Sequence, residues 1–519
     1  MFFLTDASQS KELDRHTIEE FGLPSLLLME RAALSAAGYI QENFRRTDRV
    51  YILAGCGNNG ADGLALARIL SQRGFEIKIS ASGNIEKATE EWKFQKNLLD
   101  RMDIFVDFLN AGEQIPCGFD LYVDALFGIG LSRDLSADYI ALTESFNRAV
   151  SGSKKAVCLA LDMPSGINAT TAKVCGAAVK ADVTVTFGTG KLGQYLFPGA
   201  YYCGKVIIAD IGLDTRFLQK YGMAGIKPDP VFRAAQQEDI SSMIGRRLPW
   251  GNKGTFGSVL VIAGGPGMVG AAFFSASAAY RTGCGLVRIL TAEQNRPILQ
   301  AKLPEAVICV PEEGESLGDA AARELDRCRA AVVGPGLTTG AFGLKLVEAL
   351  LHAKPGVPVV LDADALNLLK LSLTASDPGN KILPNYILTP HPGELARLLQ
   401  KKTEEVLTEG IPSASLQLWQ RTGAVCVCKD ARSVIRTNEG TPYLNVTGND
   451  GMGVGGSGDV LAGLIAGLAA QGLSSDDAAC AGVYCHGLSG DLAAAKYGRH
   501  GMTASNILEF IPEVLKIFE

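Results

Sequence analysis

The chain has 519 residues, of which 47% are hydrophobic, 20% are charged and 59 are glycine, a composition typical of a globular α/β protein with room for two to four domains. A formal net charge of −6 without any Lys/Arg cluster argues against a nucleic-acid partner. Twelve cysteines without a C-x-x-C pair indicate neither a zinc site nor a disulfide framework, and they favour a reducing cytosol.

Neither the first residues nor the longest apolar runs predict targeting or membrane insertion. The chain begins MFFLTDASQSKELDR, in which three apolar residues give way to polar ones, unlike a signal peptide. No stretch reaches 18 apolar residues without polar breaks, so no membrane span is expected. We therefore expect a cytoplasmic protein without a membrane partner.

The first part of the chain predicts helices at 7–20 and 24–43, followed by a strand, a turn and a helix over RVYILAGCGNNGADGLALARILSQRG. The turn formally matches G-x-G-x-x-G. The acidic residue that an ordinary NAD site needs about 20 positions later is missing. Asn58, Asn59 and Asp62 instead offer oxygen ligands for a cation and hydrogen bonds for a polar ligand. The alternative is a plain turn that joins a strand to a helix.

Three later apolar runs also end in polar residues. They are FDLYVDALFGIGLSRD, AVCLALDMPSGINATT and ADVTVTFGTGKLGQ. In an open parallel sheet, ligands bind outside the carboxyl ends of the strands, so we expect these turns to converge on one crevice. An isolated Asp at a strand end is more often a turn former than a catalyst.

This part resembles the N-terminal domain of the YjeF family, the NAD(P)H-hydrate epimerase, over residues 1 to about 220. The resemblance is carried by LTDASQSKELDR, LLLMERA, GCGNNGADG, VDALFG, LDMPSG and KLGQYLFPG. It implies a potassium site at Asn59, Asp124 and Ser165. Ala61 replaces a glycine of the family pattern NNGGDG, which is tolerable only if its φ is negative. The resemblance implies substrate contacts at Asn58, Asn59, Gly60, Ala61, Asp62, Gly128, Ile129, Gly130, Leu131, Ser132, Arg133, Asp134 and Asp162.

Glycine and proline interrupt the α/β rhythm in RFLQKYGMAGIKPDPVFRA, which predicts a linker near 222–232 and domains at 1–225 and 226–519. Alternation then restarts with the strand GSVLVIAGG, and strands are expected in GLVRIL, AVICV, AAVVGPGL, VPVVLDADAL, NYILTPHPGE and AVCVCKDARSVI. No Walker A pattern occurs, which argues against a P-loop kinase.

The stretch 451–463, GMGVGGSGDVLAG, places five glycines before Asp459 and a small-residue helix. Backbone N–H groups at such a helix start favour an anion, and a carboxylate in the first turn lies beside it. This geometry suits phosphoryl transfer, with Asp459 as the base for the attacking hydroxyl. The alternative is an Asp that only complements the helix dipole.

The second half resembles the nucleotide-dependent NAD(P)H-hydrate dehydratase half of the YjeF family, which has a ribokinase-like fold. The matching motifs are KGTFGSVLVIAGG, GAAFFSASAAYRTGCGLV, GPGL, LDADALN, TPHPGELARLL and GGSGDVLAG. The chain departs from the family's KGAxT, because an acid follows Lys429. The resemblance implies hydrate contacts at Ala272, Gly336, His391 and Asp459, and nucleotide contacts at Lys429, Asp430, Ala431, Arg432, Ser433 and Gly458. From the residues themselves, Asp362 and Asp364 are either a magnesium pair or strand-end turns.

We therefore predict two three-layer αβα domains, an N-terminal Rossmann-like domain and a C-terminal ribokinase-like one, in a bifunctional repair enzyme. The N-terminal domain would epimerise NADH or NADPH hydrates at C6 with K⁺, aided by Asp162 or Asp134. The C-terminal domain would dehydrate the S epimer with Mg²⁺, Asp459 and a nucleotide. The family's bacterial members use ADP and its eukaryotic ones ATP; the fused domains and the lack of a targeting sequence favour ADP.

We expect small-molecule partners and a homo-oligomer. Two alternatives stay open, a ribokinase-type kinase of a vitamin precursor and a nucleotide-binding scaffold without turnover. Stable phosphorylated product would indicate the kinase, and absence of phosphate release with hydrate would indicate the scaffold.

Overall fold

The computed structural model describes residues 1–109, 113–220, 230–310, 315–338, 343, 347, 356–375 and 385–519. The chain divides into two compact units, Phe2–Phe232 and Arg233–Glu519. The predicted boundary at 225–226, and most of the predicted linker at 222–232, lie outside the described residues.

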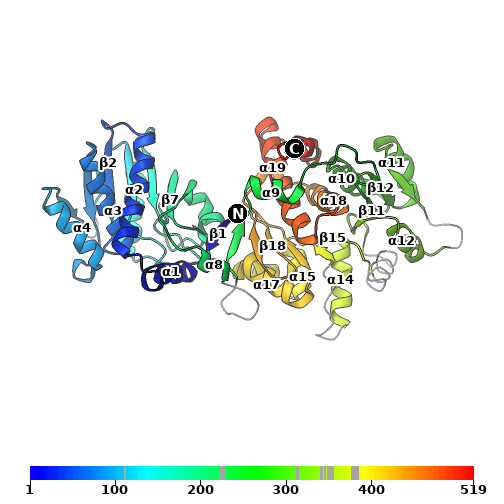
Figure 1. Cartoon of the computed structure of the whole chain (residues 1–519), viewed down its shortest axis with the longest axis horizontal. Helices are drawn as coiled ribbons and strands as arrows, with labels where there is room; N and C mark the ends of the chain where they lie inside the picture. The colour runs from blue at the N-terminus through cyan, green and yellow to red at the C-terminus, as the bar shows by residue number, and fades with distance from the viewer. Residues whose placement is uncertain are drawn as a thin grey trace. The chain divides into compact units, whose positions relative to one another are not determined.

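The N-terminal unit is built on a parallel sheet of seven described strands (Figure 1). Its central strands are almost wholly apolar and buried on both faces, as parallel strands covered by helices must be. In sheet order the strands are β4 (Val106–Phe108), β3 (Glu76–Ala81), β2 (Arg49–Ala54), β5 (Leu121–Ala125), β6 (Val157–Leu161), β7 (Val183–Phe187) and β9 (Lys205–Ala209).

Helices cover both faces of this sheet. The core on one face includes α2 (Ser25–Asn43), α3 (Asn58–Gln72) and α4 (Glu90–Asp100), and the core on the other includes α5 (Ala137–Ser151). The predicted helix at 7–20 is α1 (Ala7–Arg15) followed by a π-helical turn over His16–Glu20. The remaining short elements of the described unit are β1 (Phe2–Thr5), a 3₁₀ turn (Ile85–Lys87), β8 (Gly190–Lys191), α6 (Leu192–Tyr195), α7 (Gly199–Cys203) and α8 (Arg216–Lys220).

The strand order of the N-terminal sheet reverses at β2, which pairs with β3 on one side and β5 on the other. Loops that leave neighbouring strands in opposite directions open a crevice at such a point, outside the carboxyl ends of the strands. The predicted polar turns after β2, β5 and β6 therefore meet at one edge.

The C-terminal unit contains a second sheet, in which β11 to β17 are parallel, β18 is antiparallel to both β17 and β19, and β19 pairs in parallel with β10. The predicted α/β alternation of this half is confirmed. In sheet order its described strands are β13 (Val307–Cys309), β12 (Leu286–Leu290), β11 (Ser258–Ile262), β14 (Ala330–Val333), β15 (Val359–Leu361), β16 (Tyr386–Leu388), β17 (Val425–Cys428), β18 (Val434–Arg436), β19 (Pro442–Leu444) and β10 (Phe232–Ala234).

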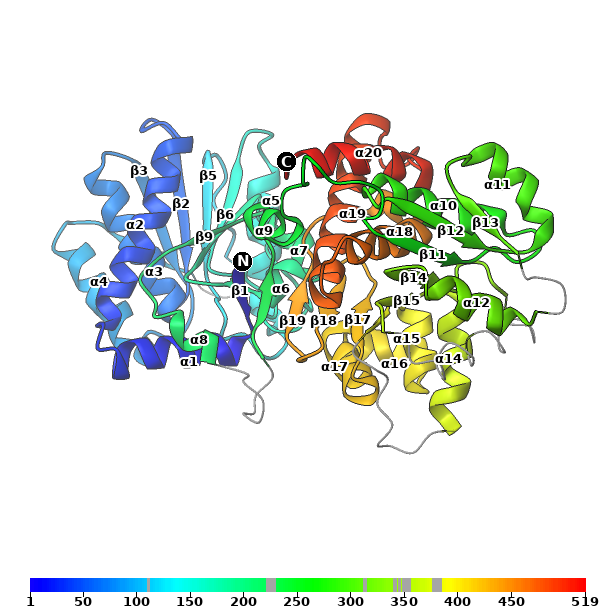
Figure 2. The same cartoon turned by 45° about the vertical axis from the view of Figure 1, so that its right-hand side comes forward.

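Helices α10 (Val269–Arg281), α18 (Ser457–Ala470), α19 (Ser475–Tyr497) and α20 (Ala504–Lys516) pack together in the main core of this unit (Figure 2). Small residues let α10 and α18 approach closely, since a Cβ on Gly463 would lie 2.0 Å from the Ser275 carbonyl oxygen. The other described helices are α9 (Gln237–Ile244), α11 (Arg296–Lys302), α12 (Leu317–Leu325), α14 (Asp364–Ala375), α15 (Pro392–Leu399), α16 (Thr403–Glu409) and α17 (Ile411–Thr422).

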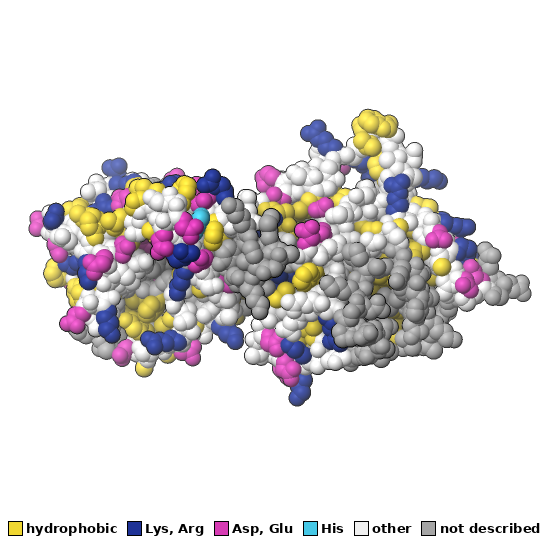
Figure 3. Space-filling model, turned by 60° about the horizontal axis from the view of Figure 1, so that its bottom comes forward, with side chains coloured by type: hydrophobic (Ala, Val, Ile, Leu, Met, Phe, Trp, Pro, Cys, Tyr) yellow, Lys and Arg dark blue, Asp and Glu magenta, His cyan; other side chains and the backbone are white. Residues whose placement is uncertain are grey.

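The described surface carries both signs of charge. Acidic and basic side chains are interspersed on the face shown in Figure 3. None of the helices in the described ranges combines the length and the hydrophobicity that a bilayer-spanning helix needs.

Candidate active sites

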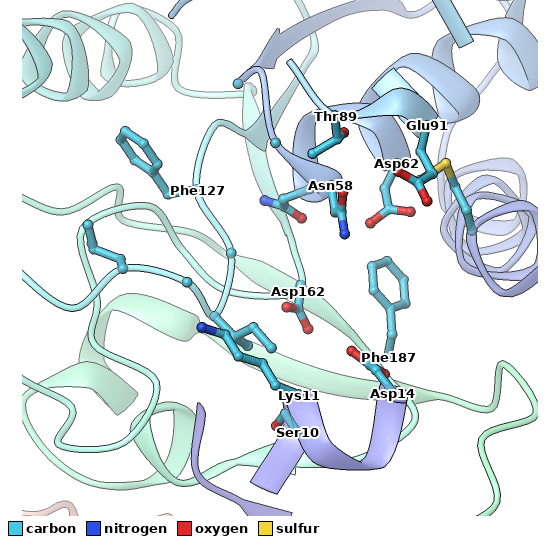
Figure 4. Close-up of a pocket in the computed structure, with 18 of the residues that line it drawn as sticks. Ser10, Lys11, Asp14, Asn58, Asp62, Thr89, Glu91, Phe127, Asp162 and Phe187 are labelled. Carbon is cyan, nitrogen blue, oxygen red and sulfur yellow. The ribbon is translucent and has the colours of Figure 1, made fainter. Parts of the chain in front are cut away.

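The N-terminal unit holds a cavity of about 830 Å³ at the reversal point of its sheet. Its walls come from α1, α2, the turn into α3, and the segments that follow β3, β5, β6 and β7, so the predicted convergence of strand ends is confirmed (Figure 4). The predicted residues among its lining are Asn58, Asn59, Asp62, Gly128, Ile129, Gly130, Leu131, Ser132, Arg133 and Asp162.

The turn into α3 is tightly packed at Gly60. A Cβ there would lie 1.8 Å from the Gly55 carbonyl oxygen, so the backbone excludes any side chain. Ala61 is different: it is fully buried in the first turn of α3 and is not one of the non-glycine residues with positive φ. The methyl group that replaces the family's second glycine is therefore accommodated without backbone strain.

Asp162, directly after β6, has a left-handed backbone with φ of 61°. Its Oδ1 accepts hydrogen bonds from Lys191 Nζ at 2.6 Å and from Thr186 Oγ1 at 3.1 Å, while Gln194 Nε2 donates to its backbone carbonyl at 2.6 Å. The other oxygen, Oδ2, lies on the Gly128 side, 3.3 Å from where a Gly128 Cβ would stand. These contacts fix one carboxylate in the wall of the cavity, with one oxygen held by a buried lysine.

Two of the three predicted potassium ligands, Asp124 and Ser165, are linked to each other and to the segment after β5. Asp124 Oδ1 accepts from Ser165 Oγ at 2.6 Å, and Ser165 Oγ in turn accepts from the Phe127 N–H at 2.8 Å. Burial raises the pKa of Asp124 to about 6, against the hydrogen bonds that favour its ionised form. The side chain of Asn59 is buried, and neither its oxygen nor its nitrogen has a hydrogen-bond partner among the residues that the structure describes. A cation beside Asn59 and Asp124 would satisfy that amide oxygen and stabilise the carboxylate, so the residues fit a weakly hydrated monovalent ion.

Asp134 does not lie with the other predicted residues of this site. It is exposed and does not belong to the cavity lining. Two lining residues that sequence reasoning missed are Asp14, on α1, and Lys191, after β7. The periodicity of α1 gives no sign that Asp14 faces a cavity, and Lys191 becomes notable only through its contact with Asp162.

Asp14 and Asp62 approach the cavity from α1 and α3, with Asp162 nearby (Figure 4). Burial raises the pKa of Asp14 to about 6, and the Asp162 charge adds to this while Lys191 opposes it. Burial, and then the charges of Asp162 and Asp14, raise the pKa of Asp62 well above its usual value. Burial in the cavity wall therefore favours the neutral form of both carboxyl groups relative to an ordinary aspartate.

The C-terminal unit gathers its predicted residues at the carboxyl edge of β14 to β17. Asp362, after β15, accepts hydrogen bonds from Thr389 Oγ1 and Lys429 Nζ, each at 2.7 Å on Oδ1. Lys429 Nζ lies 3.2 Å from where a Gly458 Cβ would stand, and Asp362 Oδ2 lies 3.7 Å from the same point. An ion pair therefore faces the N-terminus of α18.

The glycine stretch 451–463 forms the start of α18 as predicted. Gly456 caps the helix with φ of 90°, a conformation that favours glycine, and Asp459 is in the first turn. Burial raises the pKa of Asp459 to about 6, the Asp362 charge adds to the rise and Lys429 opposes it. A partly buried carboxylate, a lysine and the N-terminus of a helix thus share one small region.

His391 is the N-cap of α15, where its Nδ1 accepts a hydrogen bond from the Gly393 N–H at 3.1 Å. Glu394 completes the cap by accepting from the His391 N–H at 2.9 Å. Burial, followed by the charges of Lys429 and Arg397, lowers the pKa of His391. Burial raises the pKa of Glu394 to about 7. Sequence reasoning had not singled out Glu394.

The remaining predicted residues take varied positions. Asp430 is exposed, so the acid after Lys429 avoids a buried like-charge contact; Ala431 is exposed too, and Arg432 and Ser433 are half-buried. Gly336 lies beside the start of α10, and the side chain of Ala272 is buried within that helix. Asp364 Oδ2 accepts from the Thr338 N–H at 2.9 Å. Across the described ranges, no three His, Cys, Asp or Glu side chains group as metal ligands would.

Two family profiles match the chain in order. Residues 25–193 match the profile described as YjeF-related protein N-terminus, and residues 259–513 match that described as NAD(P)H-hydrate dehydratase. The "Bifunctional NAD(P)H-hydrate repair enzyme Nnr" of Moorella thermoacetica is 35% identical, over 100% of this chain and 97% of that protein. The protein of the same name from Escherichia coli is 33% identical, over 97% of this chain and 92% of that protein.

A solved structure matches the second half. It is the "ADP/ATP-dependent NAD(P)H-hydrate dehydratase from Bacillus subtilis co-crystallized with ATP/Mg2+", which is 31% identical. The match covers 55% of this chain and 98% of that chain, with a TM-score of 0.48.

Proposed function

This chain belongs to the family of bifunctional NAD(P)H-hydrate repair enzymes, with an epimerase domain followed by a dehydratase domain, and we propose how its residues divide that work. The observation that carries the proposal is the similarity over the whole chain, with both profiles in order. The substrate is NADH or NADPH with water added across the nicotinamide 5,6 double bond. One domain interconverts the two C6 epimers, and the other dehydrates the S epimer.

The epimerase site is the 830 Å³ cavity. Asn58 to Asp62 and Gly128 to Asp134 would hold the hydrate, with the exposed Asp134 at the outer end of its segment. Asp162, held by Lys191 at 2.6 Å, would supply a fixed negative charge close to C6. Potassium would be held by Asn59, Asp124 and Ser165, and when bound it would supply a positive charge to the site.

In the dehydratase site, Asp459 would take the proton of the C6 hydroxyl as that oxygen attacks the terminal phosphoryl group of the nucleotide. The N–H groups of Gly455 to Gly458 and the ammonium group of Lys429 would stabilise the transferring phosphoryl group. Phosphate is a far better leaving group than hydroxide. The lone pair of the ring nitrogen then expels it and restores the dihydropyridine.

The rest of the site would hold hydrate and nucleotide. Ala272, Gly336 and His391 would contact the hydrate, and the segment 429–433 would contact the nucleotide. Ala272 would do so through its backbone, because its side chain is buried. Mg²⁺ usually takes one or two carboxylates together with phosphate oxygens, so it would enter with the nucleotide phosphates and neutralise their charge.

Purified protein mixed with the two NADH hydrate epimers and a nucleotide tests this function. We expect dihydronicotinamide absorbance to return with both epimers consumed, inorganic phosphate to be released, and ADP to work better than ATP. A stable phosphorylated product would instead indicate a kinase of a small alcohol. Faster repair with ATP would overturn only the choice of donor.

We further propose a cytoplasmic homo-oligomer. Light scattering of the purified full chain measures the assembly state, and a monomer would contradict this part alone.

A further inference from the structure

The epimerase cavity contains more carboxyl groups than the binding of a hydrate needs. Asp162 is already engaged, because Lys191 and Thr186 both bond its Oδ1. Asp14 and Asp62 line the same cavity, and no hydrogen bond or ion pair joins either side chain to another described residue. Asp14 and Asp62 therefore do not stabilise the fold through such bonds, as Asp162 does, and this suggests that they have a functional role.

The positions of Asp14 and Asp62 would allow them to act on opposite faces of the same substrate atom. Asp14 belongs to α1, Asp62 belongs to α3, and Figure 4 shows both carboxyl groups directed into the space near Asp162. We propose that Asp62 and Asp14 are the catalytic acid and base of the epimerisation, acting on opposite faces of C6, while Asp162 stabilises the cation formed between them. The inference rests on the proposed epimerase function, and it assigns the proton transfers within that function.

The surroundings raise the pKa of both Asp14 and Asp62. Burial raises the pKa of Asp14 only to about 6, so at neutral pH it is mostly ionised and can accept a proton. Burial and the neighbouring charges of Asp162 and Asp14 raise the pKa of Asp62 well above its usual value, which favours the protonated form that can donate a proton. Two carboxyl groups whose pKa values are driven apart in one site are the usual arrangement of an acid and a base. The charged groups that line the cavity are Lys11, Asp14, Asp62, Lys87, Glu91, Arg133, Asp162 and Lys191.

The reaction balances without a redox partner. Asp62 donates its proton to the C6 hydroxyl, the lone pair of the ring nitrogen forms a double bond to C6, and the C6–O bond breaks to release water. A water on the Asp14 side then forms a new C6–O bond, the double-bond pair returns to nitrogen, and the water's proton passes to Asp14. Asp62 ends ionised and Asp14 protonated, ready for the reverse reaction or for proton exchange with solvent.

The test compares epimer exchange in the full chain and in three variants. We expect Asp14→Asn and Asp62→Asn each to lower kcat by ~10²–10⁴ with little change in KM, because each removes one proton transfer. The double variant should be little slower than the worse single one, because the pair acts as a unit. Glu12→Gln is the matched control: it lies on α1 but outside the cavity lining, and should keep the full rate.

Two readouts separate catalysis from structural support. The wild-type kcat should fall below about pH 6 as Asp14 becomes protonated, and Asp14→Asn should lose this acidic limb. In ¹⁸O-labelled water, every epimerised product molecule should carry the solvent oxygen at C6.

Normal exchange in both Asn variants, or product that retains its original oxygen, would overturn the acid–base assignment. A wild-type chain that never exchanges epimers would instead overturn the proposed epimerase function. Dehydration of the S epimer should be unchanged in all variants, and urea denaturation followed by the fluorescence of the buried Trp92 verifies that the N-terminal unit of each variant is folded.

Discussion

Asp162 and Lys191 form a buried ion pair 2.6 Å apart, with side chains only 13% and 4% exposed, at the wall of the epimerase cavity. The lysine also donates to Thr186 Oγ1 at 2.8 Å and to the Phe187 carbonyl at 3.0 Å, so all three of its protons have acceptors. An ionised carboxylate is thereby held at one place in a site that must tolerate a cationic intermediate.

Lys191→Met should destabilise the N-terminal unit by about 3–5 kcal/mol, because it leaves a buried carboxylate without its counter-charge. Urea denaturation followed by the fluorescence of Trp92, which is buried in this unit, measures the loss once Trp250 and Trp419 are replaced by Phe. Adding Asp162→Asn to Lys191→Met should restore most of the stability. An equal loss in the single and double variants would show that the lysine acts through packing alone.

Gly60→Ala should destabilise the same unit by about 1–3 kcal/mol or more, because its Cβ would lie 1.8 Å from the Gly55 carbonyl oxygen and backbone must move. The matched change one residue later, Ala61→Gly, should cost only about 1 kcal/mol, the helix penalty of glycine. Both are measured by the Trp92 fluorescence assay. A larger loss for Ala61→Gly than for Gly60→Ala would contradict the close approach.

Removal of potassium should slow epimerisation, since the orphaned amide of Asn59 lacks any other partner. Asn59→Ala should slow it as well and should make the remaining rate insensitive to potassium. Titration of KCl against a constant total ionic strength, with tetramethylammonium as the replacement ion, measures both effects. Wild-type epimerisation rates that do not change with potassium would contradict the proposed potassium site.

Dehydration should lose rate as the pH falls below about 6. The pKa of Asp459 is raised to about 6, and the ionised form that accepts a proton disappears below that value. Single-turnover rates at saturating hydrate and nucleotide, measured between pH 5 and 8, test this loss of rate at acidic pH. A rate that stays constant down to pH 5 would exclude Asp459 as the base.

The order of strands and helices could be predicted because local hydrophobic patterns in the sequence indicate each element. The apolar runs at 49–54 and 121–125 end in polar residues, and a parallel sheet brings those ends together. The pairing of side chains could not be predicted in the same way. Asp362 and Lys429 are 67 positions apart and meet only through the strand order, and Asp14 lies on a helix whose cavity face depends on other segments.

Asp459→Asn separates the two halves of the enzyme. The substitution keeps the shape of the side chain but removes its capacity to accept a proton, and loss of a positioned base costs ~10²–10⁴ in rate, or about 3–5 kcal/mol of barrier. The melting temperature should hardly change, because the favourable interaction with the helix dipole, about 0.3–1 kcal/mol, is opposed by burial and by the Asp362 charge. The epimerase cavity shares no residue with this site. Nucleotide-driven recovery of NAD(P)H should therefore disappear while epimer exchange continues at the wild-type rate. Equal loss of both activities would mean that the two domains are coupled, and full retention of dehydration would show that another group removes the proton.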